Sequence, residues 1–325
     1  MSKVDLSQAL HLLLQGKLVA VPTETVYGLA AIYDSTQALK EVFQRKERPL
    51  FDPLILHVSS LDQALLLADW DPLSLALAKH FWPGPLTLVL PKTDLVDPLI
   101  TAGGPTVALR CPDHPLTQEL IRNLNKPLAA PSANRFGHTS PTTADHVLQE
   151  FADQVPVLDG GPCTGGIEST VIEVNKTYRE VRILRPGALN EKVLKAFLDE
   201  RGDSHSVVVQ TADHSPGHLK NHYQPTVLFQ LVIYQGDSEP NEEVLKTHSI
   251  EGKKWTLPRD PLMAARQLYG DLRKFSKSGR SFYLCFPEAS LQDPIWRAVG
   301  DRIRKASHQW FLSRADGKIT MVEKT

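Results

Sequence analysis

The sequence has few cysteines and no long apolar run, and each absence argues against a class of protein. Its three cysteines, Cys111, Cys163 and Cys285, lie far apart in 325 residues and form no CxxC pair. They predict neither a disulfide framework nor a cysteine metal site, and we interpret them as buried or incidental thiols in a reducing compartment. No apolar run approaches the roughly 20 residues of a membrane-spanning helix. We therefore expect no membrane segment and a cytoplasmic location.

An excess of charge of one sign is also missing. The chain has 36 Lys and Arg against 37 Asp and Glu, a net charge of -1. A protein that grips a nucleic acid duplex by its backbone usually shows a basic excess, so only a local basic cluster remains open. The 22% charged and 42% hydrophobic residues are typical of folded proteins, and the length suggests about two domains.

Four familiar site motifs are absent. The sequence contains no GxxxxGK[ST] phosphate loop, no GxGxxG, no HExxH and no GxSxG. A nucleotide, if one binds, must therefore be held by another arrangement of residues.

Apolar patterning predicts the elements of the first 200 residues. Leu6, Leu10 and Leu13 recur at helical spacing, so the N-terminus is interpreted as an amphipathic helix and not as a signal peptide. Short apolar runs then alternate with helical patterns, which predicts an α/β (or α+β) domain with a large twisted sheet and flanking helices. Strands are expected at 18–22, 54–58, 86–90, 106–110, 127–130, 155–158, 169–174 and 181–184. Helices are expected at 36–43, 73–80, 116–124, 143–151 and 191–198.

A long polar stretch from Asp199 to Gln224 divides the chain. It is too long for an ordinary connection, so it is a tether or a functional lid. Beyond it, an alternating strand at 227–233, a strand at 281–286 and helices opened by Asp-Pro at 260 and 293 predict a smaller α/β unit. We therefore divide the chain into a catalytic domain at 1–200, a linker or lid at 201–225 and a C-terminal domain at 226–325.

Polar side chains collect where the predicted strands and helices end. Lys46 and Arg48 precede prolines that stop a helix, and Arg110 ends an otherwise apolar strand. Such cations either cap a helix in solvent or bind an anion. His57 lies at the end of the strand that starts at Leu54, and a histidine there is more often structural than catalytic. Together with Arg185, these residues predict an electrostatic site for a polyanionic substrate.

Hydroxyl, amide and glycine residues follow three further strands. Segment 131–134 reads Pro-Ser-Ala-Asn, segment 22–25 reads Pro-Thr-Glu-Thr, and two Gly-Gly pairs bracket the loop before Glu168. The hydroxyl and amide side chains of these segments can donate hydrogen bonds to a ligand, and the glycines let a ligand lie close to the backbone. Each segment is also compatible with an ordinary turn or hairpin.

Taken in order, these segments resemble the threonylcarbamoyl-AMP synthase family, whose catalytic part is the YrdC-like domain. The strings that carry the resemblance are VAVPTETVYGLAA, FQRKERPLFDPLILHV, FWPGPLTLVL, TVALRCPDHP, PLAAPSAN, TSPTTADHV, DGGPCTGGIESTVIEV and ILRPGAL. They cover about residues 5 to 190, and SPGHLKNHYQP with DPIWRAVGDRIRKAS resembles the two-domain branch. The family signature is Lys-x-Arg followed by Ser-x-Asn, here Lys46, Arg48, Ser132 and Asn134.

The resemblance implies a fold and a reaction. The fold is a twisted mixed sheet with helices around a concave, positively charged cavity. The reaction joins L-threonine, bicarbonate and ATP, with Mg²⁺, into threonylcarbamoyl-AMP and pyrophosphate. A threonylcarbamoyl transferase complex then modifies tRNA with the product, and a direct RNA contact is possible within this resemblance.

The resemblance also implies roles for individual residues, with Lys46 and Arg48 as the catalytic pair. The nucleotide would be held by Lys46, Arg48, Asp52, Thr106, Ser132, Asn134, Ser140, Arg185 and, from the lid, Tyr223. Threonine would be held by Thr23, His57, Arg110, Ala130 and Ser169. Asp52 stands where the family commonly has asparagine, so it would either repel phosphate or help to hold Mg²⁺; no metal site made of side chains alone is expected.

Three alternatives stay open. A carbamoyl-transferring hydrogenase-maturation enzyme uses a similar domain, but it requires cysteine pairs that the sequence lacks. A non-catalytic RNA-binding module would use the same positive cavity without consuming ATP. A metal site could use His214, His218 and His222, although no cysteine or carboxylate completes a ligand set.

Overall fold

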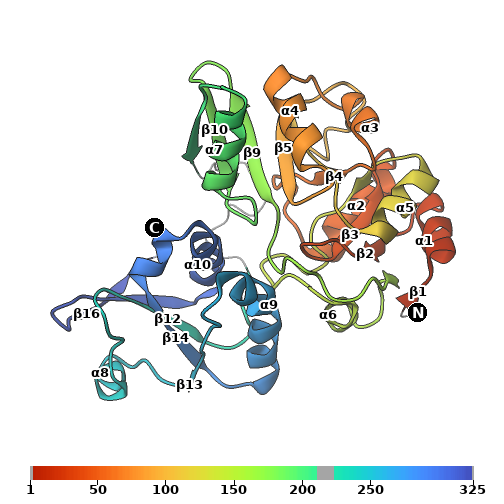
Figure 1. Cartoon of the computed structure of the whole chain (residues 1–325). Coiled ribbons are helices and arrows are strands. Elements are labelled where there is room, and N and C mark those ends of the chain that lie inside the picture. Colours follow the sequence, from red (N-terminus) through yellow and green to blue (C-terminus); the bar gives the residue numbers. More distant parts are fainter. Residues whose placement is uncertain (1–2, 211–222, 324–325) are drawn as a thin grey trace. The chain divides into compact units, whose positions relative to one another are not determined.

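The computed structural model describes residues 3–210 and 223–323, which form two compact units (Figure 1). Unit 1 comprises Met1–Phe136 and Ser140–His218, and unit 2 comprises Gly137–Thr139 and Leu219–Thr325. Each unit has its own sheet and its own core, so each is described separately.

Unit 1 is built on one mixed sheet with the order β1-β8-β2-β3-β7-β4-β6-β5-β9-β10-β11. The sheet contains parallel pairs, such as β4 with β6, and antiparallel pairs, such as β5 with β6. The strands are β1 (Lys3–Val4), β2 (Val19–Val21), β3 (Gly28–Ile32), β4 (Ile55–His57), β5 (Leu86–Pro91), β6 (Thr106–Arg110), β7 (Leu128–Ala129), β8 (Val157–Leu158), β9 (Thr170–Asn175), β10 (Glu180–Arg185) and β11 (Ser206–Val209).

The helices of unit 1 begin at capping residues that the sequence supplies. Asp5, Ser35 and Asp71 each accept a hydrogen bond from a backbone N–H in the first turn, which satisfies donors that have no partner inside the helix. The helices are α1 (Leu6–Leu14), α2 (Thr36–Lys46), α3 (Leu61–Leu65), α4 (Pro72–Phe81), α5 (Pro115–Leu124), α6 (Ala144–Glu150) and α7 (Glu191–Glu200).

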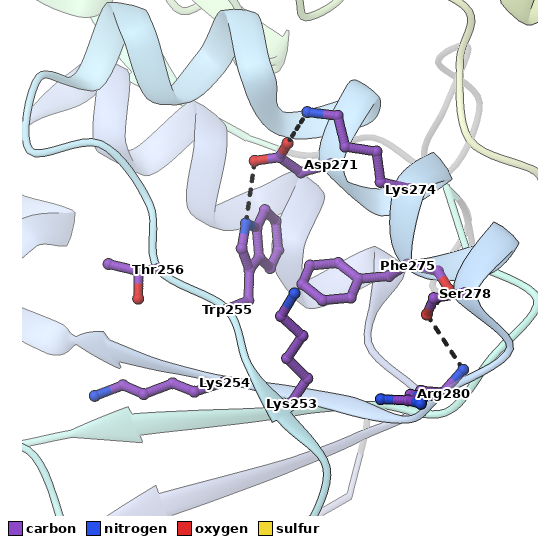
Figure 2. A pocket seen from close by; sticks show the side chains of 9 residues that line it. All are labelled: Lys253, Lys254, Trp255, Thr256, Asp271, Lys274, Phe275, Ser278 and Arg280. Atoms are coloured by element: carbon purple, nitrogen blue, oxygen red, sulfur yellow. Dashed lines mark hydrogen bonds and ion pairs between the residues drawn. The ribbon is translucent and has the colours of Figure 1, made fainter.

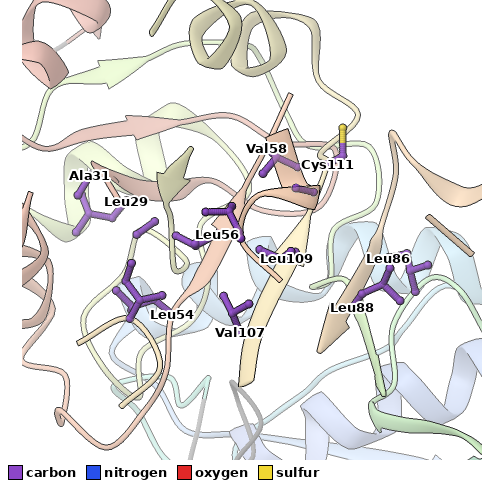
Figure 3. Close-up of a cluster of buried hydrophobic side chains, with 14 of the residues drawn as sticks. Leu29, Ala31, Leu54, Leu56, Val58, Leu86, Leu88, Val107, Leu109 and Cys111 are labelled. Carbon is purple, nitrogen blue, oxygen red and sulfur yellow. The ribbon is translucent and has the colours of Figure 1, made fainter. Parts of the chain in front are cut away.

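One face of this sheet forms the main core of unit 1. Leu56 of β4 and Leu88 of β5 both pair with Leu109 of β6, and Val107 lies two residues before Leu109. Paired residues and residues two apart on a strand point to the same side of a sheet, so all four side chains lie on this face (Figure 3). Apolar residues of α2, α3, α4, α6 and α7 belong to the same buried cluster. These helices therefore cover this face from one end of the sheet to the other.

The opposite face is apolar over only part of the sheet. Above β2, β3 and β7 it packs against α1 and α5, through a second cluster that includes Leu13, Val21, Ala30 and Leu120. Above β4, β5 and β6 the same face carries His57, Thr87 and Arg110, which alternate with the core residues. The sheet thus presents a polar region beside an apolar one.

Unit 2 contains a smaller mixed sheet with the order β13-β14-β12-β15-β16. Its strands are β12 (Phe229–Tyr234), β13 (Lys253–Lys254), β14 (Phe282–Pro287), β15 (Gln309–Ser313) and β16 (Ile319–Val322). Its helices are α8 (Glu242–Thr247), α9 (Pro261–Ser278), the 3-10 helix η1 (Glu288–Gln292) and α10 (Pro294–Ala306). Val232 and Tyr283 pack with Leu245 of α8 on one face of the sheet. Phe282, the residue before Tyr283 on β14, points to the other face and stacks on Phe275 of α9. Helices therefore cover both faces of this sheet.

The predicted fold class is confirmed: a large mixed sheet with flanking helices and a smaller C-terminal α/β part. The Asp-Pro helix starts at 260 and 293 are also confirmed, as Asp260 and Asp293 are N-caps with proline at the first helical position. The segment predicted as linker contains β11, which extends the large sheet. Residues 211–222, with His214, His218 and His222, lie outside the described residues. No helix within 3–210 or 223–323 is long and apolar enough to cross a membrane.

Candidate functional site

Strand register places polar residues in one row across the sheet of unit 1. His57 of β4 pairs with Arg110 of β6, and Arg110 pairs on its other side with Thr87 of β5. Thr87 pairs with Val171 of β9, which in turn pairs with Arg185 of β10. Residues opposite one another across a sheet point to the same side. Side chains distant in sequence therefore meet on the polar region of the second face.

Arg110 is the central cation of this row. Its side chain is buried and donates to Glu24 Oε1 at 2.6 Å and to the Gly84 carbonyl at 3.3 Å. The other oxygen of Glu24 accepts a hydrogen bond from the backbone N–H of Asp113 at 3.0 Å. A buried guanidinium requires such partners, because its desolvation costs several kcal/mol. Glu24 therefore fixes the direction in which Arg110 points.

His57 lies beside Arg110 as a neutral imidazole. Burial lowers the pKa of His57 from 6.5 to about 3, and the positive charge of Arg110 contributes to the shift. A neutral ring both donates and accepts a hydrogen bond, whereas an imidazolium only donates. His57 can thus contact a ligand without adding charge to the site.

Ser169 joins the row from the loop that precedes β9. Its hydroxyl shares a hydrogen bond of 2.7 Å with the Thr87 hydroxyl and accepts one of 2.9 Å from the Arg185 guanidinium. Arg185 also donates to the Ser169 carbonyl at 3.1 Å. The family resemblance implies that Ser169 holds threonine and Arg185 the nucleotide, and the structure brings the two side chains into contact.

Lys46 forms a second cationic centre at the end of α2. Its side chain is 1% exposed, and its ammonium donates to the carbonyls of Ser132 and Asn134, both at 2.5 Å. Burial lowers the pKa of Lys46 well below its usual value, and the nearby charge of Arg48 lowers it further. An anion beside this ammonium would stabilise its charged form.

Arg48 and Asp52 form a buried ion pair in the loop between α2 and β4. The guanidinium lies 2.9 Å from Asp52 Oδ1 and donates to the carbonyls of Asp52 and Pro53 at 3.1 Å and 2.9 Å. The parallel register of β4 and β6, continued by two residues, places Thr106 beside Pro53. Thr106 and Arg110 share a face of β6 and are four residues, or about 13 Å, apart. The polar face therefore has two ends.

Ser140 connects this region to the glycine-rich loop, since its hydroxyl donates to Glu168 Oε1 at 2.7 Å. Between Asn134 and Ser140 the chain enters unit 2 for three residues, Gly137–Thr139. Within unit 2, Thr139 donates its hydroxyl to the Tyr223 carbonyl at 3.2 Å, and the Tyr223 ring lies 5.3 Å from that of Tyr269. The predicted lid residue thus contacts the segment that connects two predicted nucleotide residues.

The Pro-Thr-Glu-Thr segment is a buried turn. Thr23 donates its hydroxyl to the Val26 carbonyl at 2.6 Å and accepts the N–H groups of Thr25 and Val26. The glycine-rich loop packs directly on it, because the Gly165 N–H donates to the Glu24 carbonyl at 2.7 Å and a Cβ on Gly165 would approach that oxygen to 3.0 Å. Both segments are therefore built for close backbone contact.

Comparison with known proteins assigns the chain to a family. A model described as telomere recombination (Sua5, YciO and YrdC) matches residues 11–187, and one described as the C-terminal domain of threonylcarbamoyl-AMP synthase matches 188–308. Threonylcarbamoyl-AMP synthase of Pyrococcus abyssi is 37% identical over 315 residues, 90% of this chain and 91% of the relative. That of Bacillus subtilis is 39% identical over 254 residues, 77% and 72% of the two chains. The chain belongs to the two-domain Sua5 family of threonylcarbamoyl-AMP synthases. It is accordingly a nucleotidyl-transferring enzyme.

Solved structures of the Sua5 family support this assignment. The structure of P. abyssi Sua5 complexed with L-threonine superposes with a TM-score of 0.81 and 33% identity, over 94% of this chain and 96% of that chain. Full-length HypF in its phosphate- and nucleotide-bound form reaches a TM-score of 0.50 with 18% identity and shares the fold alone, over 29% of its length. Membership of the Sua5 family thus extends through both parts of the chain, whereas the likeness to HypF covers one domain.

Three residues of this Sua5 chain have a place in the site that the sequence left without a role. Glu24 holds Arg110, Thr87 shares a hydrogen bond with Ser169, and Glu168 accepts from Ser140. All three lie inside strings that carry the family resemblance, but their partners are 28 to 86 residues away. Strand register places Thr87, whereas Glu24 and Glu168 lie in loops that only the tertiary fold brings to their partners.

Within the described part of this Sua5 chain, no group of three or more His, Cys, Asp and Glu residues could hold a metal ion. Asp52 acts electrostatically on Lys46, and Arg48 already contacts it. Asp52 could offer a single oxygen ligand, and phosphate oxygens would have to supply others.

Proposed function

We propose that the chain condenses L-threonine, bicarbonate and ATP into threonylcarbamoyl-AMP and pyrophosphate, for the threonylcarbamoylation of adenosine in tRNA. One observation carries this proposal. The chain matches, along nearly its whole length, a Sua5 protein whose crystal structure contains L-threonine, and its unit 1 holds two buried basic groups, Arg110 on the polar face and Lys46 at the end of α2. Two anionic substrates require such an arrangement.

The end at Arg110 is proposed to bind threonine. Arg110 would pair with the substrate carboxylate, since a guanidinium forms two parallel hydrogen bonds with a carboxylate. Neutral His57 and the Ser169 hydroxyl border it and would contact the polar groups of the amino acid. Thr23 and the backbone at Ala130 complete the proposed set. The Gly84 and Glu24 contacts hold Arg110 in place for this role.

The end at Lys46 is proposed to bind ATP with Mg²⁺. Lys46 and Arg48 would contact phosphate oxygens, and the buried ammonium would regain a full charge beside them. Mg²⁺ would be carried mainly by the phosphates, with Asp52 as its one side-chain candidate. Further nucleotide contacts are proposed for Thr106, Ser132, Asn134, Ser140, Arg185 and Tyr223.

The proposed reaction has two steps. The amine of threonine attacks bicarbonate, and loss of water gives a carbamate. A carbamate oxygen then attacks the α-phosphorus of ATP, the bond to the bridging oxygen of the β-phosphate breaks, and pyrophosphate leaves. Two anions approach one another in the second step, so Lys46, Arg48 and Arg110 lower the barrier by their charge and by placement. No side-chain nucleophile is required.

The product is a mixed anhydride that water hydrolyses, so exclusion of water favours its survival. We propose that Tyr223 and its neighbours close over the nucleotide for this reason. The product would then pass to a threonylcarbamoyl transferase complex that modifies tRNA. A cytoplasmic site of action fits this role, and a direct contact with RNA belongs to the same proposal.

The proposed function is tested by ATP–pyrophosphate exchange that depends on threonine and bicarbonate. Arg48→Ala should lower the exchange rate by about 100-fold or more, because a positioned charge at a transferring phosphoryl group contributes at least that much. Arg45→Ala, a substitution of a half-buried arginine on α2 that pairs with Glu41, is the matched control and should retain the wild-type rate. Equal activity of Arg48→Ala and wild type would rule out the site.

A further inference from the structure

Unit 2 contains a pocket of about 600 Å³ that no part of the proposed reaction uses (Figure 2). It lies between the edge strand β13 and one face of α9. Asp271, Lys274, Phe275 and Ser278 of α9 line it at helical spacing, opposite Lys253 and its neighbours from 254 to 256. Its volume falls within the roughly 300–1,000 Å³ of small-molecule sites.

Four cations line this pocket against one carboxylate. They are Lys253, Lys254, Lys274 and Arg280, and the carboxylate is Asp271. Asp271 is occupied by Lys274 at 2.9 Å and by the indole N–H of Trp255 at 3.3 Å, so it is not available to neutralise the others. The pocket therefore carries an excess of positive charge.

Two of the cations have no carboxylate partner of their own. Lys254 pairs with Glu239 on the outer side, but neither Lys253 nor Arg280 forms an ion pair with any residue in the described ranges 3–210 and 223–323. The Lys253 ammonium instead lies 5.9 Å from the centre of the Phe275 ring. These two groups come from different elements and line the same pocket, which provides an anion with two separate contacts.

Protection of a sheet edge accounts for only part of this arrangement. Lysines on an edge strand discourage pairing with other chains, and this explains Lys253 and Lys254 on β13. Lys274 lies on α9, and Arg280 lies in the loop that leads into β14, so neither belongs to the edge strand. Their presence in the same pocket has no such explanation.

An aromatic wall stands beside the charges. The Phe275 ring stacks on Phe282 at 4.0 Å, and Phe282 stacks in turn on Phe229, so the wall is rigid. Phe275 itself is only partly buried and faces the pocket (Figure 2). A planar base could stack on this ring in place of the Lys253 ammonium, whose long side chain is free to rotate.

We propose that this pocket binds a nucleoside phosphate, with the base against Phe275 and the phosphate between Lys253 and Arg280. An aromatic wall, two unneutralised cations and hydroxyls at Thr256 and Ser278 form the recognition set for that chemistry. A nucleic acid strand would instead require a basic track along the surface. The site is separate from the proposed ATP site of unit 1.

The test uses full-length protein carrying Arg48→Ala, which removes nucleotide binding in unit 1 under the proposed function. Calorimetric titration with AMP and with ATP should each show one site. Adding Lys253→Glu and Arg280→Glu should weaken the affinity for AMP and the affinity for ATP by about tenfold or more each, since a hydrogen bond to a charged group contributes about that factor. Lys277→Glu, on the exposed side of α9 and outside the pocket, should change affinity less than twofold.

Two further measurements make the outcome decisive. Inorganic pyrophosphate, which has no base, should bind more weakly than ATP, and a photoreactive 8-azido-adenine nucleotide should label a peptide within 253–280 in otherwise wild-type protein. Absence of saturable nucleotide binding, affinity that survives the double charge reversal, or binding of an RNA duplex alone would overturn the proposal. If Arg48→Ala does not remove nucleotide binding in unit 1, the titration should show two sites. Lys253→Glu with Arg280→Glu should then remove one of them.

Discussion

Two of the proposed substrate-binding arginines of unit 1, Arg110 and Arg48, are each held by a carboxylate of the chain. Arg110 contacts Glu24 at 2.6 Å, and Arg48 contacts Asp52 at 2.9 Å. All four groups are largely removed from solvent, so loss of one partner leaves a buried charge whose cost is several kcal/mol. These pairs fix the directions of the guanidinium groups before any substrate arrives, which is what precise placement of reacting anions requires.

Arg110 should not tolerate exchange for lysine. In Arg110→Lys, the KM for threonine should rise by about tenfold or more, because an ammonium cannot form the paired hydrogen bonds of a guanidinium with a carboxylate. The KM for ATP should change less than twofold. Steady-state kinetics with each substrate varied in turn measures both, with Arg122→Lys on the exposed side of α5 as control. An equal rise in both KM values would contradict the assignment of Arg110 to threonine.

His57 should make unit 1 sensitive to acid. Its pKa is about 3 in the folded protein and has its ordinary value of 6.5 in the unfolded chain, so below pH 6.5 the unfolded state binds the extra proton. Stability should therefore fall as the pH drops from 6.5 toward 3, by up to about 1.4 kcal/mol per pH unit from this residue.

The variant His57→Gln isolates that contribution. Urea denaturation at pH 7, 6, 5 and 4 should show a smaller loss of stability in the variant than in the wild type, because glutamine does not titrate. Effects of all other ionisable groups cancel in this comparison. Parallel stability curves for the two proteins over this range would show that His57 is not buried as a neutral ring.

Among the elements, the end of β10 depends on a close approach of two backbones. A Cβ on Gly187 would lie 2.5 Å from the Thr170 nitrogen and 2.6 Å from the Glu168 carbonyl oxygen. Backbone atoms cannot yield as a flexible side chain can. Gly187 thus lets the loop after Arg185 lie against the segment that carries Ser169.

Gly187→Ala should therefore lower the Tm and raise the KM for threonine together, as the two segments are forced apart, with a stability loss of about 1–3 kcal/mol. Gly270→Ala is a control that should change the stability in the opposite direction. Gly270 lies inside α9 with open space around its Cβ position, so alanine should raise stability by up to about 1 kcal/mol. Calorimetric scans and threonine kinetics of both variants provide the comparison; a Gly187→Ala enzyme with wild-type KM would disprove the coupling.

Elements with clear periodicity agree with their sequence prediction, and those without it do not. Helix α5 was expected at 116–124 and is found at Pro115–Leu124, and β6 has the expected bounds. Strand β3 was not predicted, since Gly28–Ile32 is uniformly apolar and small and is buried on both sides. Strand β11 was assigned to a linker, because four residues gain strand structure only by pairing with β10.

At the scale of the whole molecule, metal dependence should separate activity from folding. Because no group of side chains in the described ranges forms a metal cluster, EDTA should leave the Tm of the free protein unchanged within about 1 °C. The same treatment should abolish pyrophosphate release, since Mg²⁺ is proposed to enter with ATP. A large drop in Tm on chelation would indicate a structural metal and overturn this part of the proposal.

The sequence by itself determined the class of the fold, the two-part organisation and the family resemblance, because these depend on local periodicity, capping residues and ordered short strings. It also pointed to Arg110, Arg185 and Ser169, which lie close together on the polar face. It could not identify Glu24, Thr87 and Glu168 as their partners, nor the pocket beside β13. Those features depend on which strands and loops become neighbours, and that is decided by long-range burial of apolar faces rather than by any local signal.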